Sequence, residues 1–265
     1  MELSEHLLKS ITSRFINEAV EAIILVGSYA RGNAKPDSDI DITLYLKDPD
    51  AISEFKREQY EGYQLSIFKT APDHHKKSLK DPAALIWSLD YLRTAKALYD
   101  PHGTFASLQK EAQDFQWSSI QEAANVASSH KLEKYTEEVI KIVSGLKEKD
   151  DYAILNALSW LYMGLPMVMA VYRGILLTNE STFFQTVLHG VGEQSDWAKY
   201  FTIASGIKII SSNYSAMQTR GIAGLYLYKE TFNLMKESID ANDQATINNA
   251  LTLITTQLKE NAIGL

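Results

Sequence analysis

Two short stretches decide the fold: Val26-Gly27-Ser28-Tyr29-Ala30-Arg31-Gly32 and, after a brief loop, Pro36-Asp37-Ser38-Asp39-Ile40-Asp41-Ile42. The first stretch completes the apolar run Ala22 to Val26, which is typical of a buried strand ending in glycine. The second opens the segment Ile40 to Leu46, where apolar residues alternate with others as in a strand. Together they predict a strand, a tight turn, a loop and a second strand.

The two aspartates of the second stretch are the first candidate site residues. Asp39 and Asp41 are two positions apart on a predicted strand, so their side chains leave the same face. Two carboxylates on one face attract a hard cation such as Mg²⁺, which can bridge the oxygens of a triphosphate. An Asp-x-Asp pair alone is usually a solvated strand edge. The pair indicates a metal site here because it follows a Gly-Ser turn.

The turn supplies the residues that would hold phosphate. Gly27 allows the backbone to approach a phosphate closely. Ser28 opens a predicted helix whose free amides, together with its hydroxyl, can bind phosphate oxygens. Arg31 lies one turn further on and can bind a phosphate or pair with an aspartate.

The rest of the chain divides into two parts with different hydrophobic periods. Up to about residue 115 helical and strand patterns mix; after it only helical spacing remains. The pattern predicts an α+β fold, with a mixed α and β domain over residues 1–115 and an all-helical domain over residues 116–265. Within the first domain we expect helices over Leu3 to Ala19, over Ala51 to Tyr60 and after Asp81-Pro82, a strand over Gly62 to Lys69, and a short piece that ends at Ala97-Leu98-Tyr99 before a turn.

Composition narrows the classes of function. Apolar residues make up 45% and charged residues 22%, the formal net charge is −7, and there is no cysteine. Thiolate metal sites and cysteine nucleophiles are therefore excluded, and no basic groove for nucleic acid is expected. Met1 to Ile16 lacks a secretory pattern, so a cytoplasmic location is expected. Tyr152 to Tyr172 carries no charge; because polar residues and Pro166 interrupt it, we expect buried helix rather than a membrane span.

Gly27-Ser28 followed by Asp39-Ile40-Asp41 resembles the signature of the DNA polymerase β-like nucleotidyltransferase superfamily, and is most similar to its antibiotic-modifying, kanamycin-type aminoglycoside branch. The resemblance implies a mixed sheet with flanking helices followed by a helical domain, often as a homodimer. It also implies that Ser28 binds triphosphate, that Asp39 and Asp41 hold Mg²⁺, and that a nucleoside monophosphate passes from ATP or another NTP to a hydroxyl of a small acceptor.

The sequence departs from the family pattern at the third carboxylate, which the family places on the following strand. The matching position in this chain is Ser66, and Glu61 at the start of that strand is a poor substitute. A general base is expected from the first helix of the second domain, where Glu133 is the candidate and Glu137 follows one turn later. Both glutamates can equally be exposed residues that pair with nearby lysines.

Two further interpretations stay open. His74-His75 suggests a metal or phosphate site, but an exposed loop or helix start is the simpler expectation, because adjacent side chains diverge. The loss of the third carboxylate leaves a second functional class: a degenerate member that binds nucleotide or ligand without transferring it. A macromolecular acceptor is disfavoured because no basic and aromatic surface is evident.

Overall fold

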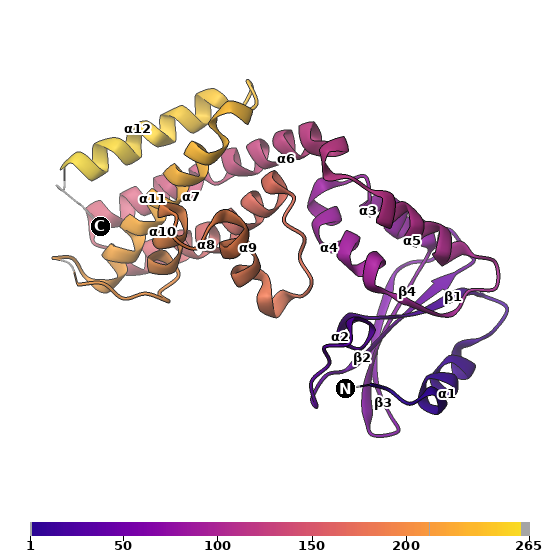
Figure 1. Cartoon of the computed structure of the whole chain (residues 1–265). Coiled ribbons are helices and arrows are strands. Elements are labelled where there is room, and N and C mark those ends of the chain that lie inside the picture. The colour runs from indigo at the N-terminus through magenta and orange to yellow at the C-terminus, as the bar shows by residue number, and fades with distance from the viewer. Residues whose placement is uncertain (1, 212, 261–265) are drawn as a thin grey trace. The chain divides into compact units, whose positions relative to one another are not determined.

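The computed structural model describes residues 2–211 and 213–260, which form two compact units. The first unit comprises Met1–Ser119 together with the short segment Leu176–Glu180, and the second comprises Ile120–Ile175 and Ser181–Leu265. Figure 1 shows the sheet and its helices in the first unit, and helices alone in the second. The predicted α+β fold is confirmed, whereas the domain boundary at residues 115 and 116 stays a prediction.

A five-stranded mixed sheet forms the centre of the first unit, in the order β3-β4-β2-β1-β5. β2 pairs with β4 in parallel, and the other neighbours are antiparallel. The strands are β1 (Val20–Val26), β2 (Ile40–Leu46), β3 (Glu54–Tyr60), β4 (Tyr63–Thr70) and β5 (Lys96–Tyr99). β2 therefore lies in the middle, so that side chains from both neighbouring strands reach its residues.

Helices cover the two faces of the sheet (Figure 1). On one face, α1 (Glu5–Phe15) packs Leu7 and Ile11 on Ile40, Ile42 and other buried aliphatic residues of the strands. The opposite face is covered by α3 (Pro72–Ser78), α4 (Pro82–Thr94) and α5 (Thr104–Asp114), and α2 (Gly27–Arg31) follows β1 directly. The segment Leu176–Glu180 joins this unit through a hydrogen bond from the Leu177 amide to the Ile86 carbonyl, 2.7 Å long.

The prediction of a helix over Ala51 to Tyr60 is wrong, because β3 (Glu54–Tyr60) is a strand at one edge of the sheet. Its sequence, Glu-Phe-Lys-Arg-Glu-Gln-Tyr, is rich in charged residues that normally favour helices. Pairing with β4 overrides that preference, and the charged side chains suit an edge strand because they discourage pairing with another chain. Because side chains alternate along a strand, every second residue of β3 lies on the same face of the sheet as Asp41.

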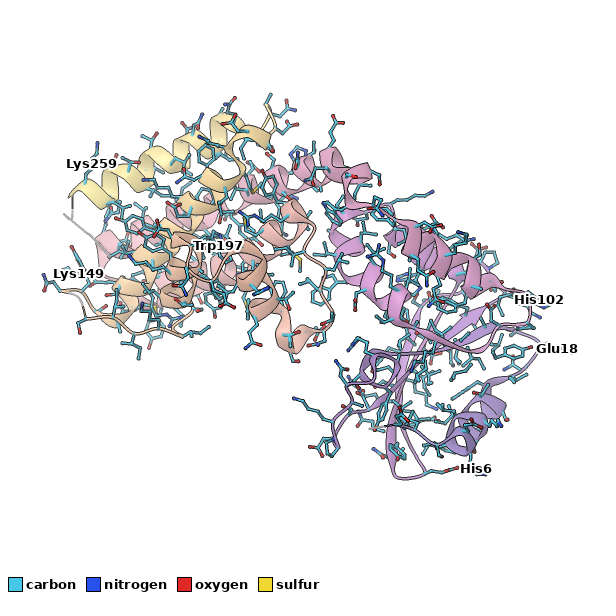
Figure 2. The ribbon with its side chains drawn as sticks, in the orientation of Figure 1. His6, Glu18, His102, Lys149, Trp197 and Lys259 are labelled. Carbon is cyan, nitrogen blue, oxygen red and sulfur yellow. The ribbon has the colours of Figure 1, made fainter. Side chains whose placement is uncertain are left out.

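The second unit is entirely helical in the residues that the structure describes, 120–175 and 181–260 without 212. Its main helices are α6 (Gln121–Lys134), α7 (Thr136–Glu148), α8 (Asp151–Arg173), α9 (Phe183–Val191), α10 (Asp196–Ala204), α11 (Ala216–Met235) and α12 (Gln244–Glu260). Trp197, labelled in Figure 2, is buried among them, where its Nε1 donates to Thr231 Oγ1.

The uncharged stretch Tyr152 to Tyr172 forms a single helix, α8, which contains Pro166. By length and composition α8 could cross a membrane, although 56% of its most apolar window is buried within the protein. One face, including Leu158, Leu161 and Leu165, packs against other helices of the unit. A core helix of a soluble protein passes the same test, and the expected absence of a membrane partner stays a prediction.

Candidate active site

The turn between β1 and α2 brings the backbone into direct contact with a carboxylate. Gly27 has a φ of +68°, which residues with a side chain rarely adopt. A Cβ atom placed on Gly27 would lie 2.1 Å from Oδ2 and 2.9 Å from Cγ of Asp41. Only glycine therefore fits between this turn and the carboxylate, and the Gly27-Ser28 turn and the aspartates form one structural unit.

Asp39 and Asp41 lie together at the start of β2, as predicted from their spacing. Asp41 pairs in register with Ser66 of β4, and Ser66 Oγ donates a 2.5 Å hydrogen bond to Oδ2 of Asp39. Ser66 thus occupies the position beside the pair at which a third carboxylate was expected. The Ser66 hydroxyl supplies a neutral donor and adds no negative ligand. Glu61 lies exposed on the β3–β4 turn, where it accepts from Ser10.

The environment of Asp41 resists a second negative charge. Burial and, after it, the nearby Asp39 carboxylate raise the pKa of Asp41 to about 7. Arg31 and Arg57 oppose this shift, but they do not cancel it. Two carboxylates that repel each other in a partly desolvated site favour the binding of a cation, because a bound cation relieves both the burial penalty and the repulsion.

Two arginines lie on opposite sides of the aspartate pair. Arg31 ends α2, half-buried, and its Nε makes no hydrogen bond in the described residues. Burial raises the pKa of the half-buried Asp90 of α4, and the charge of Arg31 partly opposes this rise. Oδ2 of Asp90 likewise lacks a partner in the described residues. Arg57 projects from β3 on the far side of Ser66, with which it pairs in register. The carboxylates are therefore flanked by positive charge toward β1 and toward β3.

A buried polar cluster continues along the same face of β2. The Thr43 hydroxyl bonds the Tyr91 hydroxyl, and Tyr45 OH lies 3.0 Å from His75 Nδ1. The His75 ring stacks on Tyr91 with centroids 5.0 Å apart. Burial lowers the pKa of His75 to about 3, so this histidine is neutral. The expectation that both histidines begin a helix holds for α3, but His75 is a core residue rather than an exposed one.

Glu133 belongs to the second unit, where it is half-buried near the end of α6. Burial and, after it, the charge of Glu133 raise the pKa of Tyr228. The Tyr228 hydroxyl donates to the Leu132 carbonyl. Unlike Glu137, which pairs with Lys141 at 2.9 Å, Glu133 makes no ion pair in the described part of the chain. Its role as a general base stays a prediction.

The donors present suit one hard divalent cation. In residues 2–211 and 213–260, no group of three or more His, Asp or Glu side chains is arranged to hold a metal. Asp39 and Asp41 nevertheless form a carboxylate pair whose mutual repulsion a cation would relieve. Oxygen ligands are those that Mg²⁺ prefers, and Mg²⁺ commonly uses one or two carboxylates together with substrate phosphates. These two aspartates are therefore the residues that would hold it.

Comparison with known proteins defines the class of domain that carries this site. Residues 5–91 match the family model of the nucleotidyltransferase domain, a range that includes the Gly27-Ser28 turn, both aspartates and Ser66. The N-terminal unit therefore has a nucleotidyltransferase fold. No curated protein matches the chain.

A solved structure extends the likeness over both units. The crystal structure of a nucleotidyltransferase-like protein from Exiguobacterium sibiricum 255-15 superimposes with a TM-score of 0.54 at 10% sequence identity. The match covers 97% of this chain and 90% of that chain. At this identity the likeness concerns the fold alone. The antibiotic-modifying branch, expected from the sequence, stays a prediction.

Arg57 and Asp90 lie near the site, although the sequence pattern alone did not indicate them. Arg57 was hidden by the wrong helix over Ala51 to Tyr60, since a helix would not place it in a row with Ser66 and Asp41. The signal was present in the alternation of Phe55, Arg57 and Gln59 along the strand. Asp90 belongs to α4, and only tertiary packing brings it near Arg31.

Proposed function

We propose that the chain transfers a nucleoside monophosphate from ATP or another NTP to a hydroxyl of a small acceptor, with Mg²⁺ as the metal. One observation supports this most directly: within a matched nucleotidyltransferase domain, Asp41 packs against the Gly27 turn and lies beside Asp39. The turn proposed to bind phosphate and the pair proposed to hold the metal are thus in contact.

Each residue has a defined part in the reaction. Ser28 and the amides of the turn bind phosphate oxygens, and Arg31 adds a positive charge beside them. Asp39 and Asp41 would hold Mg²⁺, which would neutralise charge on the phosphates. The acceptor oxygen forms a bond to the α-phosphorus as the bond to the bridging oxygen breaks, and pyrophosphate leaves. The acceptor proton passes to Glu133, and the protein mainly positions the reactants.

The resemblance also suggests an acceptor and an assembly. An aminoglycoside-like acceptor agrees with the formal net charge of −7, although net charge alone does not select a substrate. A homodimer is the assembly that the resemblance implies. Both remain part of the proposal.

A second candidate function is nucleotide binding without transfer. Ser66 at the third carboxylate position supports it, because the site then has one negative ligand fewer and a weaker hold on a cation. This candidate shares the phosphate-binding turn with the first and differs only in turnover.

Pyrophosphate release with a panel of hydroxylated acceptors separates the two candidates. We expect release from the native chain with Mg²⁺, its loss in Asp39→Asn, and native rates in Asp37→Asn, a matched change of an exposed aspartate in the same loop. Glu133→Gln should lower turnover, with Glu122→Gln on the same helix as its control. Nucleotide binding without release for any acceptor would favour the binding function, and release that persists in Asp39→Asn would refute the proposed site.

A further inference from the structure

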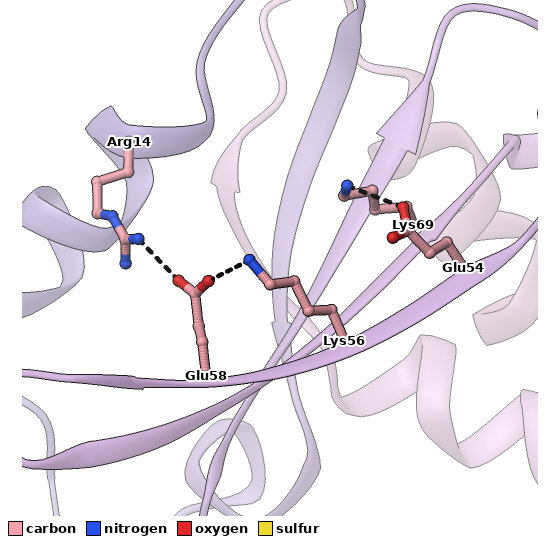
Figure 3. Close-up of polar contacts among 5 residues, drawn as sticks. All are labelled: Arg14, Glu54, Lys56, Glu58 and Lys69. Carbon is pink, nitrogen blue, oxygen red and sulfur yellow. Dashed lines mark hydrogen bonds and ion pairs between the residues drawn. The ribbon is translucent and has the colours of Figure 1, made fainter.

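The two faces of the edge strand β3 differ in whether their charged side chains form ion pairs. On the α1 face, Glu58 accepts from Arg14 and from Lys56, each at 2.7 Å, and Lys69 bonds Glu54 at 2.9 Å (Figure 3). The charged residues of that face thus neutralise one another. Exposed ion pairs of this kind contribute little to stability, but they leave no charge free to bind a ligand.

Arg57 is the charged residue of β3 on the opposite face, and its position is different. The guanidinium lies over the ring of Phe55, 4.9 Å from its centroid, and makes no ion pair or hydrogen bond in the described residues. Phe55 itself is 54% exposed, so the two side chains form a small platform of ring and guanidinium. Stacking on an aromatic ring restricts an arginine while leaving its N–H donors available.

Register places this platform next to the aspartate pair. The row across the sheet runs from Val26 of β1 to Asp41, then to Ser66 and finally to Arg57. With strands about 4.8 Å apart, the backbone of Arg57 lies about 10 Å from that of Asp41. Because Asp41, Ser66 and Arg57 lie directly opposite one another on neighbouring strands, their side chains leave the same face of the sheet.

The geometry of an in-line transfer indicates from which end of this row the acceptor approaches. In an in-line transfer the attacking hydroxyl approaches opposite the leaving pyrophosphate. The phosphate-binding turn follows β1, on one side of the aspartates, so the acceptor approaches from the side of β4 and β3. Ser66 and Arg57 are the residues of this row that lie on that side of Asp41.

We propose that Arg57 binds an anionic group of the acceptor, a phosphate or a carboxylate, and that the acceptor is therefore an anionic hydroxyl compound. This inference rests on the proposed transfer reaction and replaces the aminoglycoside-like acceptor that the resemblance suggests. It departs from the polycationic aminoglycosides, whose amino groups Arg57 would repel. The guanidinium suits either anion, since its paired N–H groups match two oxygens of a carboxylate or a phosphate.

The test uses the full chain saturated with Mg²⁺ and α,β-methylene-ATP, which fills the triphosphate site without reacting. Inorganic phosphate is titrated into this complex and followed by the backbone amide NMR signals of β3 and β4; acetate is the second probe. We expect saturable shifts in the native chain and an affinity about tenfold lower in Arg57→Ala, the loss typical of one charge-assisted hydrogen bond. Saturation by phosphate but not acetate assigns a phosphate; saturation by both admits a carboxylate.

Lys56→Ala is the matched control, because it removes one positive charge from the same strand on the opposite face. We expect it to keep the native affinity for phosphate. The inference is overturned by a native chain without a saturable response, by Arg57→Ala matching Lys56→Ala, or by aminoglycosides accepted equally well by native chain and Arg57→Ala. If the nucleotide analogue itself fails to bind, the proposed function fails first; if it binds normally, only the inference about Arg57 is at stake.

Discussion

Along β2, the side chains on the face that packs on α1 are apolar, whereas those on the face toward α3, α4 and α5 are polar or charged. Ile40, Ile42 and Leu44 of β2 point into the apolar core, whereas Asp41, Thr43 and Tyr45 between them point to the other side. Successive residues of β2 thus alternate between packing in the apolar core and lining the polar face. A rigid apolar face lets the polar face hold two repelling carboxylates in place.

The largest expected effect separates function from stability at position 41. Asp41→Asn removes one of the two carboxylates proposed to hold the metal and should lower the proposed transfer by about 10³-fold, since a bound metal lowers the barrier by several kcal/mol. The fold should persist, because an uncharged amide suits a partly buried site better than a carboxylate whose pKa is raised to about 7. Pyrophosphate release and thermal unfolding measured on the same sample check both parts. Strong destabilisation would contradict the assignment of Asp41 to function.

A substitution at position 42 should lower stability and leave nucleotide binding unchanged. Ile42 is 1% exposed in the core beneath α1, so Ile42→Ala should cost about 2–5 kcal/mol of unfolding free energy. Urea denaturation measures this loss. Below the denaturation midpoint, nucleotide binding should stay near native, because the side chain points away from the site. A large change in nucleotide affinity at full folding would mean that the two faces are not independent.

Gly27→Ala tests the contact between turn and carboxylate. The new Cβ needs space that Asp41 occupies and a backbone conformation that alanine avoids, so we expect a loss of about 1–2 kcal/mol in stability. Displacement of Asp41 should also weaken nucleotide binding in the presence of Mg²⁺. Gly32→Ala is the control: it has a similar φ of +76° but no atom within 4 Å of its Cβ position. If both variants lose affinity equally, backbone strain rather than the contact is responsible.

His75 predicts how the polar face responds to pH. Its pKa is lowered to about 3 in the folded chain, so below pH 6.5 the unfolded chain binds a proton that the folded chain does not. Stability is therefore full above pH 6.5 and falls toward acid pH, by about 2 kcal/mol between pH 7 and pH 5 from this residue. Urea denaturation should show a shallower pH dependence in His75→Gln. Equal slopes in the native chain and in His75→Gln would show that His75 does not act as described.

Much of this contrast between faces could be predicted from the sequence. The period-two pattern of Ile40 to Leu46 placed Asp39 and Asp41 on one face, and the Gly-Ser turn was found because local spacing determines local geometry. The strand β3 was missed because charged residues with helical preference form an edge strand only through pairing with β4. Arg57, Asp90 and buried His75 depend on contacts between distant segments, which a single sequence does not specify.

The central claim is that the Gly27 turn and the aspartate pair form one nucleotide site that depends on a metal. Calorimetry of ATP binding, with and without Mg²⁺, to the native chain and to Asp39→Asn tests it most directly. The account predicts binding that requires Mg²⁺ and is lost or strongly weakened in the variant. Equal ATP affinity with and without Mg²⁺, or in the native chain and Asp39→Asn, would contradict it.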